Sequence, residues 1–374
     1  MTETTKGVLR LEGLTKHFGD VRAVEDLTLD VPHGSFVALL GPSGCGKTTT
    51  MNLIAGLETP TAGEIYFDGR PMSAVDPGKR NVGFVFQNYA IFTHMRVYDN
   101  LAFGLRVRKH RVSKGELDAS VHKIARLVGV TDVLDRKAGR LSVNDMQKVA
   151  LGRSMIVTPA IFLLDEPFSN LDAAFRAYMR AELKRIQHEI RQTMIYVTHD
   201  QVEAMGMADK IAVMNLGVLQ QYGTPAEIYN RPATRFVASF VGSVLMNFIP
   251  CRYEPRDGRA TVVAGEVESR PIDVSDRRAP IEERVRPGER LTLAIRPERV
   301  RVVSPEADEA TLQGKVTLVE PLGAKDVVHL SCDGSQIRTV LKPDERPRIG
   351  ERLGLVLGAE EVHLFDDETG LALR

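Results

Sequence analysis

The stretch Ser35-Phe-Val-Ala-Leu-Leu-Gly41-Pro-Ser-Gly-Cys-Gly-Lys47-Thr48 decides the fold of the first part of this chain. Its apolar run, 35–40, predicts a buried strand, and residues 48–55, apolar at helical spacing, predict a helix. Between them stands the pattern G-x-x-x-x-G-K-[ST] of a phosphate-binding loop. Backbone N–H groups of such a loop and the positive end of the following helix converge on phosphate oxygens, so the sequence predicts a site for ATP or GTP.

Each part of this loop has an expected role. The Lys47 ammonium supplies positive charge for the β- and γ-phosphates, and the Thr48 hydroxyl is a candidate ligand of Mg²⁺. Cys45 is expected to be only a small residue of the turn. The candidate ATP-binding residues of the loop are Gly41, Pro42, Ser43, Gly44, Cys45, Gly46, Lys47, Thr48 and Thr49.

Length and composition narrow the class of protein. A chain of 374 residues suggests two or three domains. Its 49 basic and 49 acidic residues cancel, so no overall field draws it toward nucleic acid or an anionic membrane. Three separated cysteines fit a reducing compartment, and no apolar run reaches the roughly eighteen residues of a membrane span. The polar start does not resemble a signal peptide, so membrane association is expected only through a partner.

The first domain is predicted to be α/β and to end near residue 242. Apolar runs such as 160–164 and 194–198 alternate with helical segments, which is typical of a largely parallel sheet covered on both faces. The segment 89–155 is mainly helical in pattern and contains the capping box Ser113-Lys-Gly-Glu116. A second capping box, Thr224-Pro-Ala-Glu227, predicts a short helix near the domain end.

The second domain, 243–374, has the pattern of a β domain. Short apolar or β-branched segments at 290–295, 315–319 and 327–330 are separated by Gly, Pro and Asp. Such spacing predicts short strands joined by turns.

Two carboxylates stand at the end of a predicted strand in Leu163-Leu-Asp165-Glu166-Pro. Asp165 can hold Mg²⁺, and Glu166 can polarise the water that attacks the γ-phosphate. An acidic pair after an apolar run is otherwise often the start of a helix. Its place after the phosphate loop in one predicted sheet favours the catalytic interpretation.

Three further residues have two interpretations each. His199 ends the strand 194–198 and can donate to the γ-phosphate, or it can serve as a capping or core histidine. The Gln87 amide oxygen can reach the metal or the attacking water, although a lone glutamine is more often structural. Phe18 can stack on a purine, although a lone phenylalanine more often belongs to a core.

In their order along the chain these residues resemble the nucleotide-binding subunit of an ABC transporter. The resemblance implies ATP and Mg²⁺, with Glu166, His199 and Gln87 as catalytic residues. Metal ligands are then expected at Thr48, Gln87 and Asp165. The motifs so assigned are the adenine platform at Phe18, Walker A at 41–48, the Q-loop at Gln87, the signature beginning at Leu141-Ser142, Walker B at Asp165-Glu166, the D-loop at Ser169-Asn-Leu-Asp172 and the switch histidine at His199.

The tail resembles the OB-type (TOBE-type) regulatory domain of maltose and glycerol-phosphate importer ATPases. The implied architecture is a P-loop ABC ATPase domain at 1–242, with a helical subdomain at 89–155, followed by the OB-like domain at 243–374. Such a subunit is a peripheral motor on the cytoplasmic face of the membrane for import of a carbohydrate, polyol or related solute. Its implied partners are two transmembrane permeases, a second ATPase subunit and, indirectly, a solute-binding protein.

The signature segment departs from the family's L-S-G-G-Q, because this chain has Leu141-Ser-Val-Asn-Asp145. In the family each ATP lies between the Walker A of one subunit and the signature of the other. Val143 and Asn144 put side chains where glycines let the backbone approach the phosphate. Asp145 gains about 0.3–1 kcal/mol from the helix dipole. It would lose roughly 4 kcal/mol at about 4 Å from a phosphate.

Asp145 can instead turn away, toward Lys148, while Ser142 and Asn144 still donate to the phosphate. The chain's own half-site keeps its motif residues, whereas the signature that it lends to a neighbour is altered. We therefore expect a second, non-identical ATPase subunit with a better signature, with a homodimer as the alternative. Two other functions stay open: a slow or regulatory subunit that clamps ATP, and a soluble ABC ATPase acting on nucleic acid or ribosomes. No nucleic-acid partner is expected, because the tail lacks a basic strip with interleaved aromatic residues.

Overall fold

The computed structural model describes residues 8–86, 90–107, 112–169, 171–265, 269–332 and 334–374. They form two compact units, Met1–Ile228 and Tyr229–Arg374. The division precedes the expected boundary at 242/243. Helix α8 (Arg235–Phe240) accounts for the difference, because its Ala238 is buried in one cluster with Ala294 and Phe365 of the second unit.

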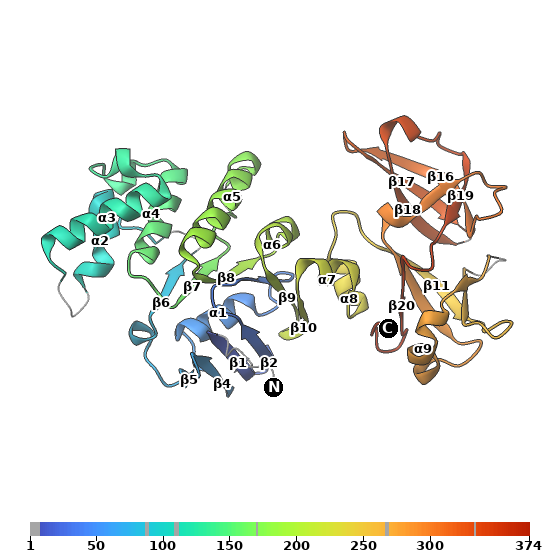
Figure 1. Ribbon diagram of the computed structural model, residues 1–374, viewed down its shortest axis with the longest axis horizontal. Helices are drawn as coiled ribbons and strands as arrows, with labels where there is room; N and C mark the ends of the chain where they lie inside the picture. Colours follow the sequence, from blue (N-terminus) through green and yellow to red (C-terminus); the bar gives the residue numbers. More distant parts are fainter. Residues whose placement is uncertain (1–7, 87–89, 108–111, 170, 266–268, 333) are drawn as a thin grey trace. The chain divides into compact units, whose positions relative to one another are not determined.

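A mixed sheet forms the centre of the first unit (Figure 1). In the described part of the chain its order is β10-β9-β3-β8-β7-β6, parallel except for the antiparallel edge strand β10. The bounds are β3 Phe36–Leu40, β6 Val82–Val85, β7 Ile161–Asp165, β8 Thr193–Thr198, β9 Lys210–Asn215 and β10 Val218–Gly223. Every residue of β3 and β8 is buried, as expected of strands covered on both faces. The predicted α/β class with a largely parallel sheet is confirmed.

An antiparallel sheet lies beside the central one, in the order β2-β1-β4-β5. Its strands are β1 Leu9–Phe18, β2 Val21–Val31, β4 Ala62–Phe67 and β5 Arg70–Pro71. One apolar cluster joins both sheets through helix α1 (Lys47–Ala55), which contributes Met51 and Leu53. The helix that follows the phosphate loop is therefore fixed from two sides.

Three helices of the first unit lie together away from the antiparallel sheet (Figure 1): α2 (Val97–Arg106), α3 (Lys114–Val128) and α4 (Val143–Met155). The capping box at the start of α3 is present, because Ser113 and Glu116 each accept from the other's backbone N–H. Gly129 ends the helix at a φ of +69°. The predicted helical subdomain is confirmed as part of the fold.

The remaining helices of the first unit border the central sheet or lead out of it. They are α5 (Ala173–Ile190) and α6 (Gln201–Met207), together with α7 (Pro225–Asn230), whose last two residues belong to the second unit. The predicted capping box precedes α7, where Glu227 accepts from the Thr224 backbone N–H at 2.7 Å. Within the described residues, no helix is long and apolar enough to cross a membrane.

The second unit is built mainly of strands, as predicted. Its described strands form sheets in the orders β13-β12-β11-β14-β20 and β15-β19-β16-β17-β18. The bounds are β11 Asn247–Tyr253, β12 Thr261–Ala264, β13 Ile272–Asp273, β14 Arg290–Ile295, β15 Arg301–Val303, β16 Leu312–Pro321, β17 Asp326–Cys332, β18 Ser335–Leu341, β19 Arg352–Val356 and β20 Val362–Phe365, with helix α9 at Arg278–Arg284. One apolar cluster joins the two sheets, with Leu293 and Leu330 among its members. The expected all-β, OB-like class is confirmed.

Candidate active site

The phosphate-binding loop lies between β3 and α1, as the sequence predicts. Gly44 and Gly46 have φ values of +78° and +100°, which side-chain-bearing residues rarely adopt. A Cβ on Gly41 would overlap the Met214 carbonyl oxygen, and one on Gly46 would overlap the Ala23 carbonyl oxygen. Glycine at these positions therefore serves both the turn and the close approach of neighbouring backbone.

Lys47 is buried at the base of the loop. Its Nζ donates to the carbonyl oxygens of Gly41 and Pro42, each at 2.8 Å, so the loop itself surrounds the ammonium group. The Cys45 thiol lies 3.6 Å from the same Nζ, and burial raises its pKa. A thiol so placed is not activated as a nucleophile, which fits its expected role as a small turn residue.

Asp165 ends β7 directly opposite the first turn of α1. The Thr48 hydroxyl lies 3.4 Å from its Oδ1, so the two candidate metal ligands lie together. Burial, and then the negative charge of Glu166, raises the pKa of Asp165, while Thr48 and Lys47 oppose the rise. The charged form of the Asp165 carboxyl group is therefore disfavoured, and a bound cation would stabilise it.

Glu166 adopts a φ of +43°, an uncommon conformation for a residue with a side chain. Its backbone N–H donates to the Val197 carbonyl oxygen at 3.1 Å, which ties it to the neighbouring strand β8. Its Oε1 lies 3.0 Å from Nδ1 of His199. Two of the three residues predicted as catalytic are thus in contact, although they are far apart in sequence.

A cleft of about 530 Å³ lies over the loop. It is lined by the predicted residues Ser43, Gly44, Gly46, Lys47, Thr48, Thr49, Asp165 and Glu166. Sequence reasoning missed four other lining residues, which are Val21, Arg22, Ala23 and Leu216. Backbone hydrogen bonds of neighbouring residues hold them at the cleft. The Gly217 N–H donates to the Cys45 carbonyl oxygen at 3.1 Å, and the Gly217 carbonyl oxygen accepts from the Glu25 N–H at 2.9 Å. No motif in the sequence marks them.

The two remaining candidates for the nucleotide site are Phe18 and Gln87. Phe18 is the last residue of β1, pairs with Val21 of the cleft, and is 46% exposed. Lys16 Nζ lies 4.7 Å from the centre of its ring. An exposed ring beside the cleft fits an adenine platform better than a core residue. Gln87 lies outside the described residues.

The signature residues begin α4 and are not among the described residues lining the cleft. Ser142 is the helix cap, and its Oγ accepts from the Asp145 backbone N–H at 3.1 Å. The same hydroxyl donates to the Asp145 carboxylate at 2.9 Å. Asp145 thus turns toward Ser142 rather than toward Lys148, whose Nζ lies 5.9 Å from the centre of the Tyr178 ring.

Val143 is 45% exposed at this helix start, whereas Asn144 and Asp145 are half-buried. Asp172 of the expected D-loop caps α5, accepting from the Phe175 N–H at 2.9 Å. Asn170 of the same segment lies outside the described residues.

The donors at the cleft suit a magnesium ion that comes with its nucleotide. Among the described residues, no group of three or more His, Cys, Asp and Glu side chains could hold a metal alone. Mg²⁺ bound with nucleotide needs only one or two protein oxygen ligands, the rest being phosphate and water. The adjacent Thr48 hydroxyl and Asp165 carboxylate meet that need.

Comparisons with known proteins agree with this geometry. The ABC transporter family matches residues 24–169, and the TOBE domain family matches residues 293–365. A trehalose/maltose import ATP-binding protein of Thermococcus litoralis is 43% identical over 98% of this chain and 99% of its own length. An sn-glycerol-3-phosphate import ATP-binding protein of Cereibacter sphaeroides is also 43% identical, over 98% and 99%.

Solved structures resemble the first unit. The cbiO1 subunit of Clostridium perfringens, part of an ABC transporter complex, has a TM-score of 0.56 and 26% identity, covering 60% of this chain and 90% of that one. The bacterial ABC transporter cassette MJ0796, solved as a dimer, has a TM-score of 0.53 and 27% identity, covering 58% and 98%.

Fold and site together define an ATPase of the P-loop class that hydrolyses ATP as part of an ABC transporter. The chain belongs to the ABC transporter family, as an ATP-binding subunit of the sugar and glycerol-phosphate importer type.

Proposed function

We propose that this chain drives import of a carbohydrate, polyol or related solute by ATP hydrolysis. The observation that carries the proposal is the contact between Glu166 Oε1 and His199 Nδ1, which lie 3.0 Å apart beside the phosphate loop. The solutes imported by the relatives, among them maltose, trehalose and glycerol 3-phosphate, support the class of cargo. The chain would sit at the inner face of the cell membrane and act on two permease subunits, with a solute-binding protein delivering the cargo.

The roles of the site residues follow from their positions. Glu166 accepts a hydrogen bond from the attacking water, and His199 fixes the orientation of that carboxylate. Lys47 exchanges the carbonyl oxygens of Gly41 and Pro42 for phosphate oxygens. Mg²⁺, held by Thr48 and Asp165, would neutralise charge on the phosphates when bound.

Replacing Glu166 by Gln tests the catalytic role. The Glu166→Gln variant should bind ATP but hydrolyse it about 10²- to 10⁴-fold more slowly, because the amide cannot act as a base. Both properties are measured in the assembled transporter, with Glu283→Gln, an exposed position of the second unit, as control. Unchanged hydrolysis would mean that the chain clamps ATP as a regulatory subunit while another site does the chemistry.

We further propose that the partner ATPase subunit is not identical to this chain. Val143 and Asn144 carry side chains at the start of α4, and the Ser142 hydroxyl is engaged by Asp145 at 2.9 Å. A signature segment with these side chains, and with its serine hydroxyl already hydrogen-bonded, offers fewer hydrogen-bond donors to the nucleotide bound by a neighbouring subunit. The alternative is a homodimer, the arrangement that the dimeric structure of the MJ0796 cassette exemplifies.

Turnover by the purified chain alone tests the pairing. We expect slow ATP hydrolysis that rises severalfold when Val143, Asn144 and Asp145 are replaced together by Gly, Gly and Gln. An Asp20→Asn variant, altered at an exposed carboxylate of the same unit, should remain slow. Brisk turnover by the unaltered chain would favour the homodimer.

A further inference from the structure

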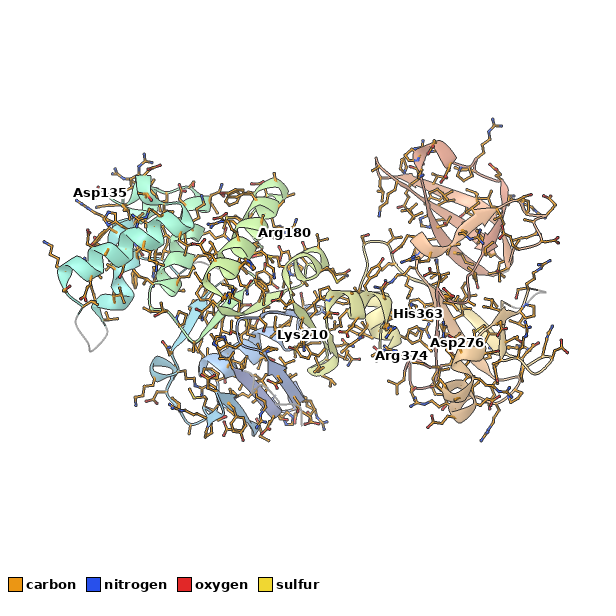
Figure 2. All side chains as sticks on the ribbon, viewed as in Figure 1. Asp135, Arg180, Lys210, Asp276, His363 and Arg374 are labelled. Atoms are coloured by element: carbon orange, nitrogen blue, oxygen red, sulfur yellow. The ribbon has the colours of Figure 1, made fainter. Side chains whose placement is uncertain are left out.

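A cleft in the second unit gathers positively charged side chains. Its volume is about 420 Å³, and its walls come from β20, from the residues before α9 and from the end of the chain. Arg231, Arg277 and Arg374 line it together with His363. Figure 2 labels His363 and Arg374 of this group, with Asp276 of the same cleft. None of these residues belongs to the nucleotide site.

Arg277 is held rigidly at the wall. Its guanidinium donates to the carbonyl oxygens of Val362 at 2.6 Å and Ala359 at 2.9 Å. Asp276 Oδ2 lies 3.3 Å from its Nε. Because three neighbours already fix the guanidinium group, a ligand that binds it does not incur the entropy cost of ordering this side chain.

Arg374 and Arg231 bring like charges close together. One N–H of the Arg374 guanidinium donates to the Arg231 carbonyl oxygen at 2.6 Å, and in the described part of the chain Arg374 makes no ion pair with a carboxylate. Burial, and then the positive charge of Arg231, lowers the pKa of Arg374. An anion beside the Arg374 guanidinium would favour its charged form.

His363 lines the same cleft, and its lowered pKa keeps the ring neutral at physiological pH. Burial lowers its pKa to about 4, and the positive charges of Arg296, Arg277 and Arg374 add to the effect. The neutral ring can donate one hydrogen bond and accept another. Asp276 and Glu360 line the same cleft as hydrogen-bond acceptors.

We propose that this cleft binds a small phosphorylated sugar or polyol. Guanidinium groups bind phosphate oxygens with paired, charge-assisted hydrogen bonds. The carboxylates of Asp276 and Glu360 suit the several carbon-bound hydroxyl groups of a sugar or polyol, which extend beyond the phosphate. The volume is at the small end of ligand pockets, which fits a molecule of the size of a hexose phosphate. The proposal does not depend on the imported solute.

Calorimetric titration of the full chain tests this binding. Saturating MgADP fills the phosphate loop, so that added phosphate compounds cannot bind there. Glucose 6-phosphate should then bind at one site per chain, inorganic phosphate more weakly, and glucose not at all. Arg374→Gln should weaken glucose 6-phosphate about tenfold or more, the loss of one charge-assisted contact.

Two variants make the result specific. Arg252→Gln, which removes the same charge from an exposed position of β11, should leave the affinity unchanged. Glu360→Gln should weaken glucose 6-phosphate but not inorganic phosphate. The proposal is overturned if glucose 6-phosphate gives no binding, if Arg374→Gln leaves it unchanged, or if inorganic phosphate binds equally well. ATP hydrolysis is measured separately, so failure here would not bear on the transport function.

Discussion

At the scale of single residues, the nucleotide site contains one charged group with favourable contacts and one without. Lys47 is satisfied by carbonyl oxygens of its own loop, whereas Asp165 is buried next to the second carboxylate of Glu166. The raised pKa of Asp165 means that its charged form costs folding free energy. This cost is absent below its ordinary pKa of 3.8 and fully present above the raised value, and therefore at neutral pH.

Replacing Asp165 by Asn should therefore stabilise the nucleotide-free chain while abolishing ATP hydrolysis. The melting temperature of the first unit is expected to rise by about 2–4 °C for each kcal/mol of penalty removed. Calorimetry at pH 7 without nucleotide measures the shift, with Asp20→Asn as an exposed control. A lower melting temperature for Asp165→Asn would show that the buried carboxylate is favourable as it stands.

At the scale of elements, caps fix where the functional helices begin. Ser142 caps α4, Asp172 caps α5 and Asp200 caps α6, each accepting from backbone N–H groups of the first turn. Ser113 and Glu116 do the same for α3 reciprocally. Because most of these caps lie in the motifs, the same residues set the local structure and stand near the chemistry.

The cap of α3 allows a test of stability apart from chemistry. Ser113→Ala should lower the free energy of unfolding by about 1 kcal/mol, because N–H groups of the first turn lose their partner. Urea denaturation followed by helical circular dichroism gives the value. Ser120→Ala within the same helix is the control and should be neutral or slightly stabilising, since alanine favours helix. Equal losses in both variants would contradict a capping role.

Prediction from sequence succeeded best at this scale. The loop, its flanking strand and helix, and the capping boxes are decided by a few adjacent residues, and each is present in the structure. Leu216 and Ala23 could not be predicted at the nucleotide cleft, because backbone hydrogen bonds of their neighbours Gly217 and Glu25 bring them there from elsewhere in the chain. The turn of Asp145 toward Ser142 likewise depended on three-dimensional geometry.

At the scale of the whole molecule, each compact unit has a hydrophobic core of its own. Chemistry for ATP lies in the first unit, and the arginine-lined cleft lies in the second. In the second unit, we expect protonation of His363 to lower the stability of the fold at acid pH. Its pKa falls from the ordinary 6.5 to about 4 through burial and through the positive charges of Arg296, Arg277 and Arg374.

The sign of this effect is fixed by proton binding. The unfolded chain takes up a proton on His363 near pH 6.5 and the folded chain only near pH 4, so stability is lost as the pH falls between them. The loss is at most about 1.4 kcal/mol per pH unit. His363→Gln should reduce the acid dependence of the second unit's melting temperature over this range, measured without ligand. Identical pH profiles for variant and parent would contradict it.

The sequence by itself determined the nucleotide loop, the order of its companion motifs, the α/β and β character of the two parts, and the departure at Val143-Asn-Asp145. These depend on local backbone geometry and on the type of residue at each position. Only the tertiary structure decided that Glu166 contacts His199, that Arg22 and Leu216 reach the loop, and that three arginines share a cleft. Those contacts join residues distant in sequence through strand pairing and packing, which no local pattern records.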